Sequence, residues 1–230
     1  MTCIALTNMP LTEPERLRLA NLPTPIEQIS SIRSGWTVSV KRDDLTGAAL
    51  SGNKVRKLEY LLADAMARGA RRVVTCGGLQ SNHCRATAVA AAQVGLASLL
   101  FLRTRMPPRP DDTPTGNLKL ARLVGAEVRF VTPDEYVNRR ALMADEAGPQ
   151  DYVIPEGGSN ALGAWGYIRA IDEMIDHWKT PPSAIVCATG SGGTLAGLTI
   201  GACRRGLAVP VHGIAVALLQ AAKSQKARGE

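Results

Sequence analysis

The chain has 230 residues, 45% of them apolar and 20% charged, and its formal net charge is +7. The length suggests one or two domains, and the apolar content excludes a disordered polyelectrolyte. No dense run of Lys and Arg interleaved with aromatic residues occurs, which argues against a nucleic-acid partner. Because no run of about 18 apolar residues and no signal-like N-terminus is present, we expect a cytoplasmic protein with no membrane partner.

Short β-branched runs alternate with longer helical patterns along the chain. Most runs are apolar on both faces, as expected for parallel strands that are covered on both sides. The predicted strands are Thr37–Lys41, Arg72–Thr75, Ala97–Leu102, Glu127–Val131, Tyr152–Ile154, Ala184–Ala188 and Val211–Val216. The predicted helices are Asn53–Ala67, Ser81–Val94, Gly116–Leu123, Pro133–Glu146, Leu162–Trp178 and Gly193–Arg205. The alternation predicts an α/β fold with mainly parallel sheets.

The cysteines show neither a Cys-x-x-Cys pair nor the spacing of zinc ligands, and we predict no metal site. They are Cys3, Cys76, Cys84, Cys187 and Cys203. Reduced, buried thiols are the simplest interpretation.

A lysine stands at the start of the first predicted helix, in the segment Ser51–Lys54. The helix N-terminus and the neighbouring cations Arg56 and Lys57 both favour the neutral form of the Lys54 amine. A neutral amine is what Schiff-base chemistry needs. A solvated basic helix start is the alternative, since charged helix ends are common on protein surfaces.

Glycines and hydroxyl residues fill the loop Cys187–Thr194, between a predicted strand and a predicted helix. The N–H groups of such a loop and of the helix N-terminus can bind a phosphate, and Ser191 and Thr194 add hydroxyl donors. A dinucleotide fingerprint fails at Leu195, where a small residue is needed, and no Walker lysine is present. A nucleotide-binding protein and a tight turn without a ligand are the alternatives.

The segment Gly77–His83 also joins a predicted strand to a predicted helix. Ser81 is a candidate helix cap, the N–H groups beside it can bind a carboxylate, and Asn82 can hydrogen-bond a cofactor oxygen. On its own, His83 is more typical of a structural histidine. A lysine, a phosphate loop and a polar helix start in one α/β fold together suit pyridoxal phosphate (PLP), which needs an amine, a phosphate-binding loop and groups on its ring oxygen.

These segments resemble the D-cysteine desulfhydrase/1-aminocyclopropane-1-carboxylate (ACC) deaminase family of PLP enzymes. They occur in the family's order over roughly residues 22–216 and are Leu22–Pro25, Lys41–Asp44, Ser51–Glu59, Gln80–His83, Pro155–Gly163 and Thr189–Thr194. The combination is far more specific than any one segment. The stretch Gly157–Gly163 looks more like the desulfhydrase branch than the deaminase branch.

The resemblance implies a role for each segment. Lys54 carries PLP and moves protons at the substrate carbon, and Asn82 contacts the ring hydroxyl and the substrate. Ser81 and His83 face the substrate, with Ser81 near its carboxylate or acting as a catalytic hydroxyl. The phosphate is held by Thr189, Gly190, Ser191, Gly192, Gly193 and Thr194. The implied reaction is α,β-elimination on a small amino acid, with D-cysteine giving pyruvate, sulfide and ammonia; ACC deamination is the alternative.

The resemblance also implies the tryptophan-synthase-β-like PLP fold, with two parallel-sheet, three-layer α/β domains, and a homodimer. The smaller domain covers residues 53–160, the larger combines residues 1–52 and 161–230, and PLP lies between them. The segment Leu218–Glu230 does not resemble the strands and helices that continue the larger domain in similar proteins. We therefore expect a larger domain that is incomplete at its C-terminus and lacks the partner of the pyridine nitrogen. An inactive PLP-fold protein is a further alternative.

Overall fold

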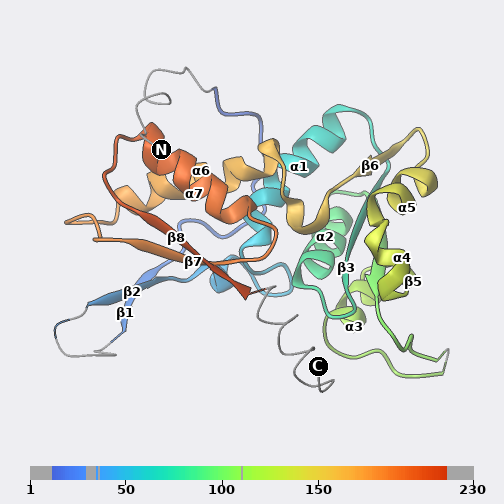
Figure 1. Ribbon diagram of the computed structural model, residues 1–230. Helices are drawn as coiled ribbons and strands as arrows, with labels where there is room; N and C mark the ends of the chain where they lie inside the picture. Colours follow the sequence, from blue (N-terminus) through green and yellow to red (C-terminus); the bar gives the residue numbers. More distant parts are fainter. Residues whose placement is uncertain (1–11, 30–34, 36, 110, 217–230) are drawn as a thin grey trace. The chain divides into compact units, whose positions relative to one another are not determined.

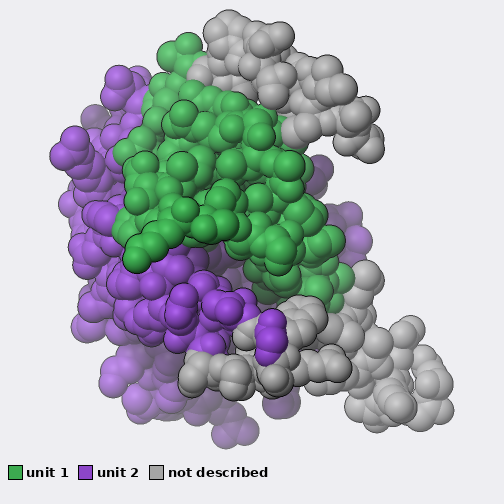
Figure 2. Space-filling model, turned by 90° about the vertical axis from the view of Figure 1, so that its left-hand side faces the viewer, with its two compact units in different colours: residues 1–14, 159–230 green, residues 15–158 purple. Residues whose placement is uncertain are grey.

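The computed structural model describes residues 12–29, 35, 37–109 and 111–216 (Figure 1). The chain divides into two compact units (Figure 2). Unit 1 comprises residues 1–14 and 159–230, and unit 2 comprises residues 15–158. Both units contain parallel strands connected by helices, so the predicted α/β fold class is confirmed. No helix among the described residues is long and apolar enough to cross a membrane.

Unit 2 is built on a four-stranded parallel sheet with the strand order β5-β4-β3-β6. The strands are β3 (Arg72–Gly78), β4 (Ala97–Arg103), β5 (Glu127–Val131) and β6 (Asp151–Val153). β3 lies inside the sheet and pairs in parallel with both β4 and β6. The segment that follows β3 is therefore delivered to the carboxyl edge of the sheet, where ligands bind in open α/β folds.

Helices cover both faces of this sheet. They are α2 (Asn82–Gln93), α3 (Gly116–Leu123), α4 (Pro133–Val137) and α5 (Arg139–Glu146). Successive residues of a strand point to opposite faces. Accordingly, Leu99 and Phe101 of β4 pack in one buried cluster with α4 and α5, while Leu100 and Leu102 pack in another with α2 and α3. Unit 2 is therefore three-layered.

The helix α1 (Lys54–Ala67) packs against α2. Its apolar stripe of Leu58, Leu61, Leu62 and Ala65 is fully buried, as the helical spacing predicts. Ahead of α1 lie an antiparallel pair, β1 (Ile26–Ile29) with β2 (Val38–Lys41), and a short 3-10 helix, η2 (Asp43–Leu45). A second 3-10 turn, η3 (Glu156–Gly158), closes unit 2.

The compact units differ from the expected domains in the placement of residues 15–52, which group here with residues 53–158. Glu59 of α1 explains much of this grouping. Its buried carboxylate accepts hydrogen bonds from the side chain of Arg16 at 2.8 Å and from the N–H groups of Leu19 and Ala20, each at 2.9 Å. The domain division implied by the resemblance stays a prediction.

The described part of unit 1 contains two helices and a pair of parallel strands. They are α6 (Ala161–Ile175), β7 (Ile185–Thr189), α7 (Gly193–Arg204) and β8 (Val211–Ala215). The helices α6 and α7 approach closely because α7 presents Gly197 and Gly201 to α6. A Cβ atom at Gly197 would lie 2.5 Å from the carbonyl oxygen of Ala164, and one at Gly201 would lie 2.8 Å from that of Ile168.

Every predicted strand and helix is present within a few residues of its expected bounds. Two details differ. The strand β1 was not predicted, because its sequence is short and half polar. The single helix predicted over residues 133–146 is divided at Asn138, which ends α4 and precedes α5. The segment 218–230, for which no family-like structure was expected, lies outside the described residues.

The cysteines follow the prediction in part. Cys76 and Cys84 are buried free thiols, and Cys187 is also free. Cys203 of α7 is disulfide-bonded, so the expectation of reduced thiols is wrong at this position. The connectivity of cysteines cannot be deduced from sequence spacing alone.

Candidate functional site

Lys54 is the first residue of α1, where the sequence places it. Its side chain is half-buried, and its Nζ atom lies 3.1 Å from Oδ1 of Asn53. Burial lowers the pKa of the Lys54 amine, because the charged form loses hydration. The neutral form, which is the nucleophile in Schiff-base chemistry, is thereby favoured.

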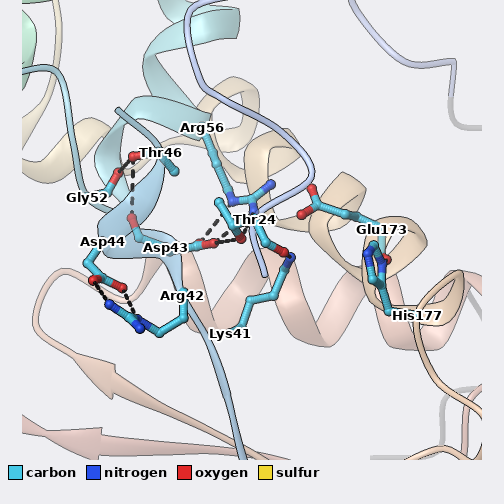
Figure 3. Close-up of polar contacts among 10 residues, drawn as sticks. All are labelled: Thr24, Lys41, Arg42, Asp43, Asp44, Thr46, Gly52, Arg56, Glu173 and His177. Atoms are coloured by element: carbon cyan, nitrogen blue, oxygen red, sulfur yellow. Dashed lines mark hydrogen bonds and ion pairs between the residues drawn. The ribbon is translucent and has the colours of Figure 1, made fainter. Parts of the chain in front are cut away.

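The two cations beside Lys54 are buried, so a solvated basic helix start is wrong. Arg56 and Lys57 are each 1% exposed. Arg56 donates from Nε and Nη2 to the carboxylate of Asp43 at 2.9 and 2.8 Å (Figure 3). Lys57 donates to the carbonyl oxygen of Gly157 at 3.3 Å. Burial lowers the pKa of Lys54, whereas the sequence predicts this lowering from the helix N-terminus and these cations.

The first turn of α2 follows directly after β3 and carries Ser81, Asn82 and His83. Ser81 is the N-cap, as predicted, and its hydroxyl accepts a hydrogen bond from the N–H of Cys84 at 3.2 Å. Oδ1 of Asn82 accepts from the side-chain amide of Asn117 at 2.8 Å. With this oxygen occupied, Asn82 offers its N–H donors to a ligand oxygen.

His83 is buried, with 4% of its surface exposed. Its Nε2 atom lies 2.9 Å from the hydroxyl oxygen of Thr75 on β3. Burial, with smaller effects of the nearby charges of Lys54 and Lys57, lowers the pKa of His83 to about 3. His83 is therefore neutral at physiological pH, and the nearby positive charges further disfavour its protonation.

Unit 1 carries the glycine loop between β7 and α7, where the sequence predicts it. Gly192 is the N-cap of α7, with a left-handed backbone (φ 83°) and no side-chain cap hydrogen bond. The N–H groups of a helix N-terminus of this kind can bind an anion. The hydroxyl groups of Ser191 and Ser159 lie 2.7 Å apart. This contact joins Ser159 to the glycine loop within unit 1. The residues of this loop fit an anionic group such as a phosphate.

Sequence reasoning missed several residues at these sites. Each of them makes a direct contact with a predicted site residue that lies at least eight positions away in the sequence. They are Thr75, Asn117 and Ser159. Only Ser159 had a signal, since it lies inside a family-like segment. Burial raises the pKa of the Cys84 thiol to about 12, so this thiol beside Ser81 is not a ready nucleophile. Among the described residues, no cluster of His, Cys, Asp and Glu could hold a metal ion.

Comparison with known proteins identifies the family. The model of a family described as "Pyridoxal-phosphate dependent enzyme" matches residues 17–230. The chain belongs to this family. Its cofactor is PLP, in agreement with the prediction from the lysine, the glycine loop and the polar helix start.

Three relatives refine the likeness. A putative 1-aminocyclopropane-1-carboxylate deaminase of Thermotoga maritima is 47% identical over 212 residues, which cover 87% of this chain and 66% of that protein. The mitochondrial bifunctional D-cysteine desulfhydrase/1-aminocyclopropane-1-carboxylate deaminase of Arabidopsis thaliana is 44% identical over 214 residues, which cover 86% of this chain and 53% of that protein. The crystal structure of an ACC deaminase homologue has a TM-score of 0.75 at 36% identity and covers 87% of this chain and 63% of that chain.

These likenesses confirm the resemblance to the desulfhydrase/deaminase family and its PLP-enzyme fold. The chain spans less than two thirds of the length of each of these relatives.

Proposed function

We propose that this chain is a PLP-dependent lyase that performs α,β-elimination on a small amino acid, most simply D-cysteine. D-cysteine and water would give pyruvate, hydrogen sulfide and ammonia. The observation that carries the proposal is Lys54: a half-buried amine with a lowered pKa at the first position of a helix, in a chain of the PLP-enzyme family. The names of the relatives support a D-cysteine desulfhydrase or ACC deaminase reaction.

In this proposal, described residues supply the amine, the ring-oxygen contact and the phosphate-binding loop of a PLP site. Lys54 would carry the cofactor, and the N–H donors of Asn82 would bind its ring oxygen. The loop Thr189–Thr194, comprising Thr189, Gly190, Ser191, Gly192, Gly193 and Thr194, would bind its phosphate through the N-terminus of α7. Ser81, Asn82 and His83 would bind the substrate, with the first N–H groups of α2 favouring its carboxylate.

The chemistry is divided between the cofactor and the chain. PLP, when bound, supplies an electron sink for negative charge at the substrate Cα. Lys54 would move the proton at Cα, and this role needs the neutral amine that burial favours. Ser81 is held by Cys84 and lies at the start of α2, where it would orient the substrate or act as a catalytic hydroxyl.

ACC deamination is the second candidate reaction, because the names of both relatives include it. Cyclopropane ring opening and sulfide elimination differ in the product that accompanies ammonia. Parallel assays with D-cysteine, L-cysteine and ACC therefore separate them: sulfide from D-cysteine supports the first proposal, and ammonia from ACC alone supports the second.

The first test is an absorbance spectrum of the purified protein with and without added PLP, with Lys54→Ala as the variant. We expect a visible band of lysine-bound cofactor that borohydride removes and that the variant lacks. Absence of the band at excess PLP would overturn the assignment of Lys54. Stoichiometric PLP binding without turnover of any amino acid would instead support an inactive PLP-fold protein.

We further propose a cytoplasmic homodimer, with no nucleic-acid or membrane partner, in keeping with the scattered basic residues. Light scattering tests the dimer, and fractionation of cells tests the location. The location needs its own test because disulfides such as that of Cys203 are uncommon in the cytoplasm.

A further inference from the structure

Arg85 is a buried cation of α2 that contacts the loop in front of Lys54. Its exposed fraction is 7%. Nη1 donates to the carbonyl oxygen of Ala49 at 2.8 Å and to the hydroxyl of Ser51 at 3.0 Å, while Nη2 donates to the carbonyl oxygen of Ser51 at 2.9 Å. One guanidinium group thus binds three oxygen atoms of the loop 49–51.

These contacts link two segments that the proposed function uses. The loop 49–51 leads through Gly52 and Asn53 directly to Lys54. Arg85 lies one helical turn after Ser81, and its N–H donates to the carbonyl oxygen of Ser81 at 3.1 Å. Arg85 therefore connects the loop before Lys54 to the first turn of α2.

The chemistry of the contact explains why an arginine is required. No carboxylate forms an ion pair with Arg85 among the described residues, in contrast to Arg56, which is bound by Asp43. A buried charge without a counter-ion is costly, and its hydrogen bonds are the compensation. A guanidinium fork reaches three acceptors on neighbouring groups at once, whereas a lysine ammonium is a compact point charge. Hydrogen bonds from a charged donor also exceed neutral ones in strength.

A second anchor holds the other end of the same loop. The buried hydroxyl of Thr46 shares its hydrogen between the carbonyl oxygens of Gly52 at 3.2 Å and Asp43 at 3.3 Å (Figure 3). Gly52 has a φ of 95°, a conformation that favours glycine, so the turn before Lys54 has a special backbone shape. With Thr46 fixing Gly52 and Arg85 fixing residues 49–51, both arms of the turn are held.

We propose that Arg85 is a positioning residue that fixes the loop 49–53 on α2 and thereby places the Lys54 amine for reaction with the cofactor aldehyde. This inference rests on the proposed role of Lys54. Arg85 acts through the loop and does not itself touch the cofactor in this proposal.

The test uses four variants of the full chain: Arg85→Met, Arg85→Lys, Ser51→Ala and Arg68→Met. Arg68 is the matched control, because it is an exposed arginine of unit 2 that pairs with Asp64 on the surface. Hydrogen exchange of the cofactor-free proteins is measured for peptides covering residues 46–54. The rate at which added PLP forms a borohydride-trapped adduct at Lys54 is measured by mass spectrometry.

We expect Arg85→Met to speed exchange in residues 49–53 and to slow adduct formation, each by about tenfold or more, the effect of losing a hydrogen bond to a charged group. Arg85→Lys should recover part of both effects, Ser51→Ala should show a smaller change in the same direction, and Arg68→Met should match the unmodified protein. If Arg85→Met fails to fold, the exchange and adduct rates of Arg85→Lys and Ser51→Ala are compared with those of the unmodified protein instead.

Wild-type exchange and adduct rates in both Arg85→Lys and Ser51→Ala would overturn the role of Arg85, as would a loss of global stability without a specific change in residues 49–53. If the unmodified protein forms no adduct at Lys54, the proposed function fails, and the exchange data still decide whether Arg85 fixes the loop.

Discussion

The imidazole of His83 and the hydroxyl of Thr75 form a hydrogen bond whose direction is determined by a third group. The Thr75 hydroxyl lies 2.8 Å from the carbonyl oxygen of Ile154, to which it can only donate. Its single hydrogen is then used, so it must accept from Nε2 of His83 at 2.9 Å. A neutral imidazole carries one N–H, and Nδ1 is therefore the lone-pair atom. This buried atom has no hydrogen-bond partner among the described residues.

The first prediction concerns this tautomer. We expect the ring nitrogens of His83 to show the 15N NMR shifts of an Nε2–H imidazole throughout neutral pH. The chain has only three histidines, so His83→Gln assigns the signals directly. Thr75→Val should remove the preference for Nε2–H and cost about 1–3 kcal/mol of stability, because the Ile154 carbonyl loses its partner. Thr75→Ser should keep the wild-type spectrum. An Nδ1–H signal in the unmodified protein would contradict the assignment.

The second prediction concerns the effect of His83 on stability at low pH. Its pKa is about 3 in the folded state against 6.5 for the ordinary group. Between these values the unfolded chain binds a proton that the folded chain does not, so the free energy of unfolding decreases as the pH falls from 6.5 towards 3. The slope from this one group is about 1.4 kcal/mol per pH unit.

Urea unfolding at several pH values between 4 and 6.5 measures this slope. His83→Gln keeps an N–H donor for Thr75 but cannot titrate, so its stability should fall less steeply with acidification than that of the unmodified protein. His177→Gln, which changes an exposed histidine two residues after the end of α6, is the control. Equal slopes in His83→Gln and the unmodified protein would show that His83 does not titrate differently on unfolding.

The sequence predicts the elements of this chain well because their signals are local. The apolar stripe of α1 and the glycine loop before α7 can be read within a dozen residues. The strand β1 escaped prediction, since it is short, half polar and stabilised by pairing with β2. The same reasoning places Lys54, Ser81 and Gly192 at helix starts, where the structure has them.

Side-chain environments could not be predicted in the same way. Arg56 and Lys57 look like surface charges, but their partners are Asp43 and Gly157, and the second of these lies 100 residues away. Arg85 looks like an ordinary helix residue, although it binds a loop 34–36 residues earlier. Such burial depends on the tertiary fold, which a single sequence does not show without the resemblance to a family.

The third prediction tests the close approach of β3 and the N-cap of α2. A Cβ atom at Gly77 would lie 2.5 Å from Oγ and 2.7 Å from Cβ of Ser81. A Cβ atom at Gly78 would have no neighbouring atom within 4 Å among the described residues. Gly77→Ala should therefore displace Ser81 and weaken its cap on Cys84, lowering stability by about 1–2 kcal/mol. Gly78→Ala is the matched control and should change stability little. Thermal unfolding and the equilibrium affinity for PLP measure the two effects. Similar behaviour of the two variants would contradict the contact.

The last prediction concerns the packing of α6 and α7 in unit 1. Alanine normally stabilises a helix relative to glycine by up to about 1 kcal/mol. At Gly197, however, an added Cβ atom would lie 2.5 Å from the carbonyl oxygen of Ala164 and 2.6 Å from Cβ of Tyr167. Neither atom is the end of a flexible side chain, so the helices must separate, at a cost of about 1–3 kcal/mol.

The packing cost should exceed the gain in helix propensity, and Gly197→Ala should lower the stability of unit 1. Thr199→Ala is the control on the same helix, because Thr199 is exposed and its hydroxyl donates to the carbonyl oxygen of Leu195 within α7. Hydrogen exchange of peptides from α6 and α7 reports the stability of unit 1 separately from that of the rest of the chain. Both helices should exchange faster in Gly197→Ala, and neither should exchange faster in Thr199→Ala. Slower exchange in Gly197→Ala would mean that propensity outweighs packing and that the two helices are not in close contact at Gly197.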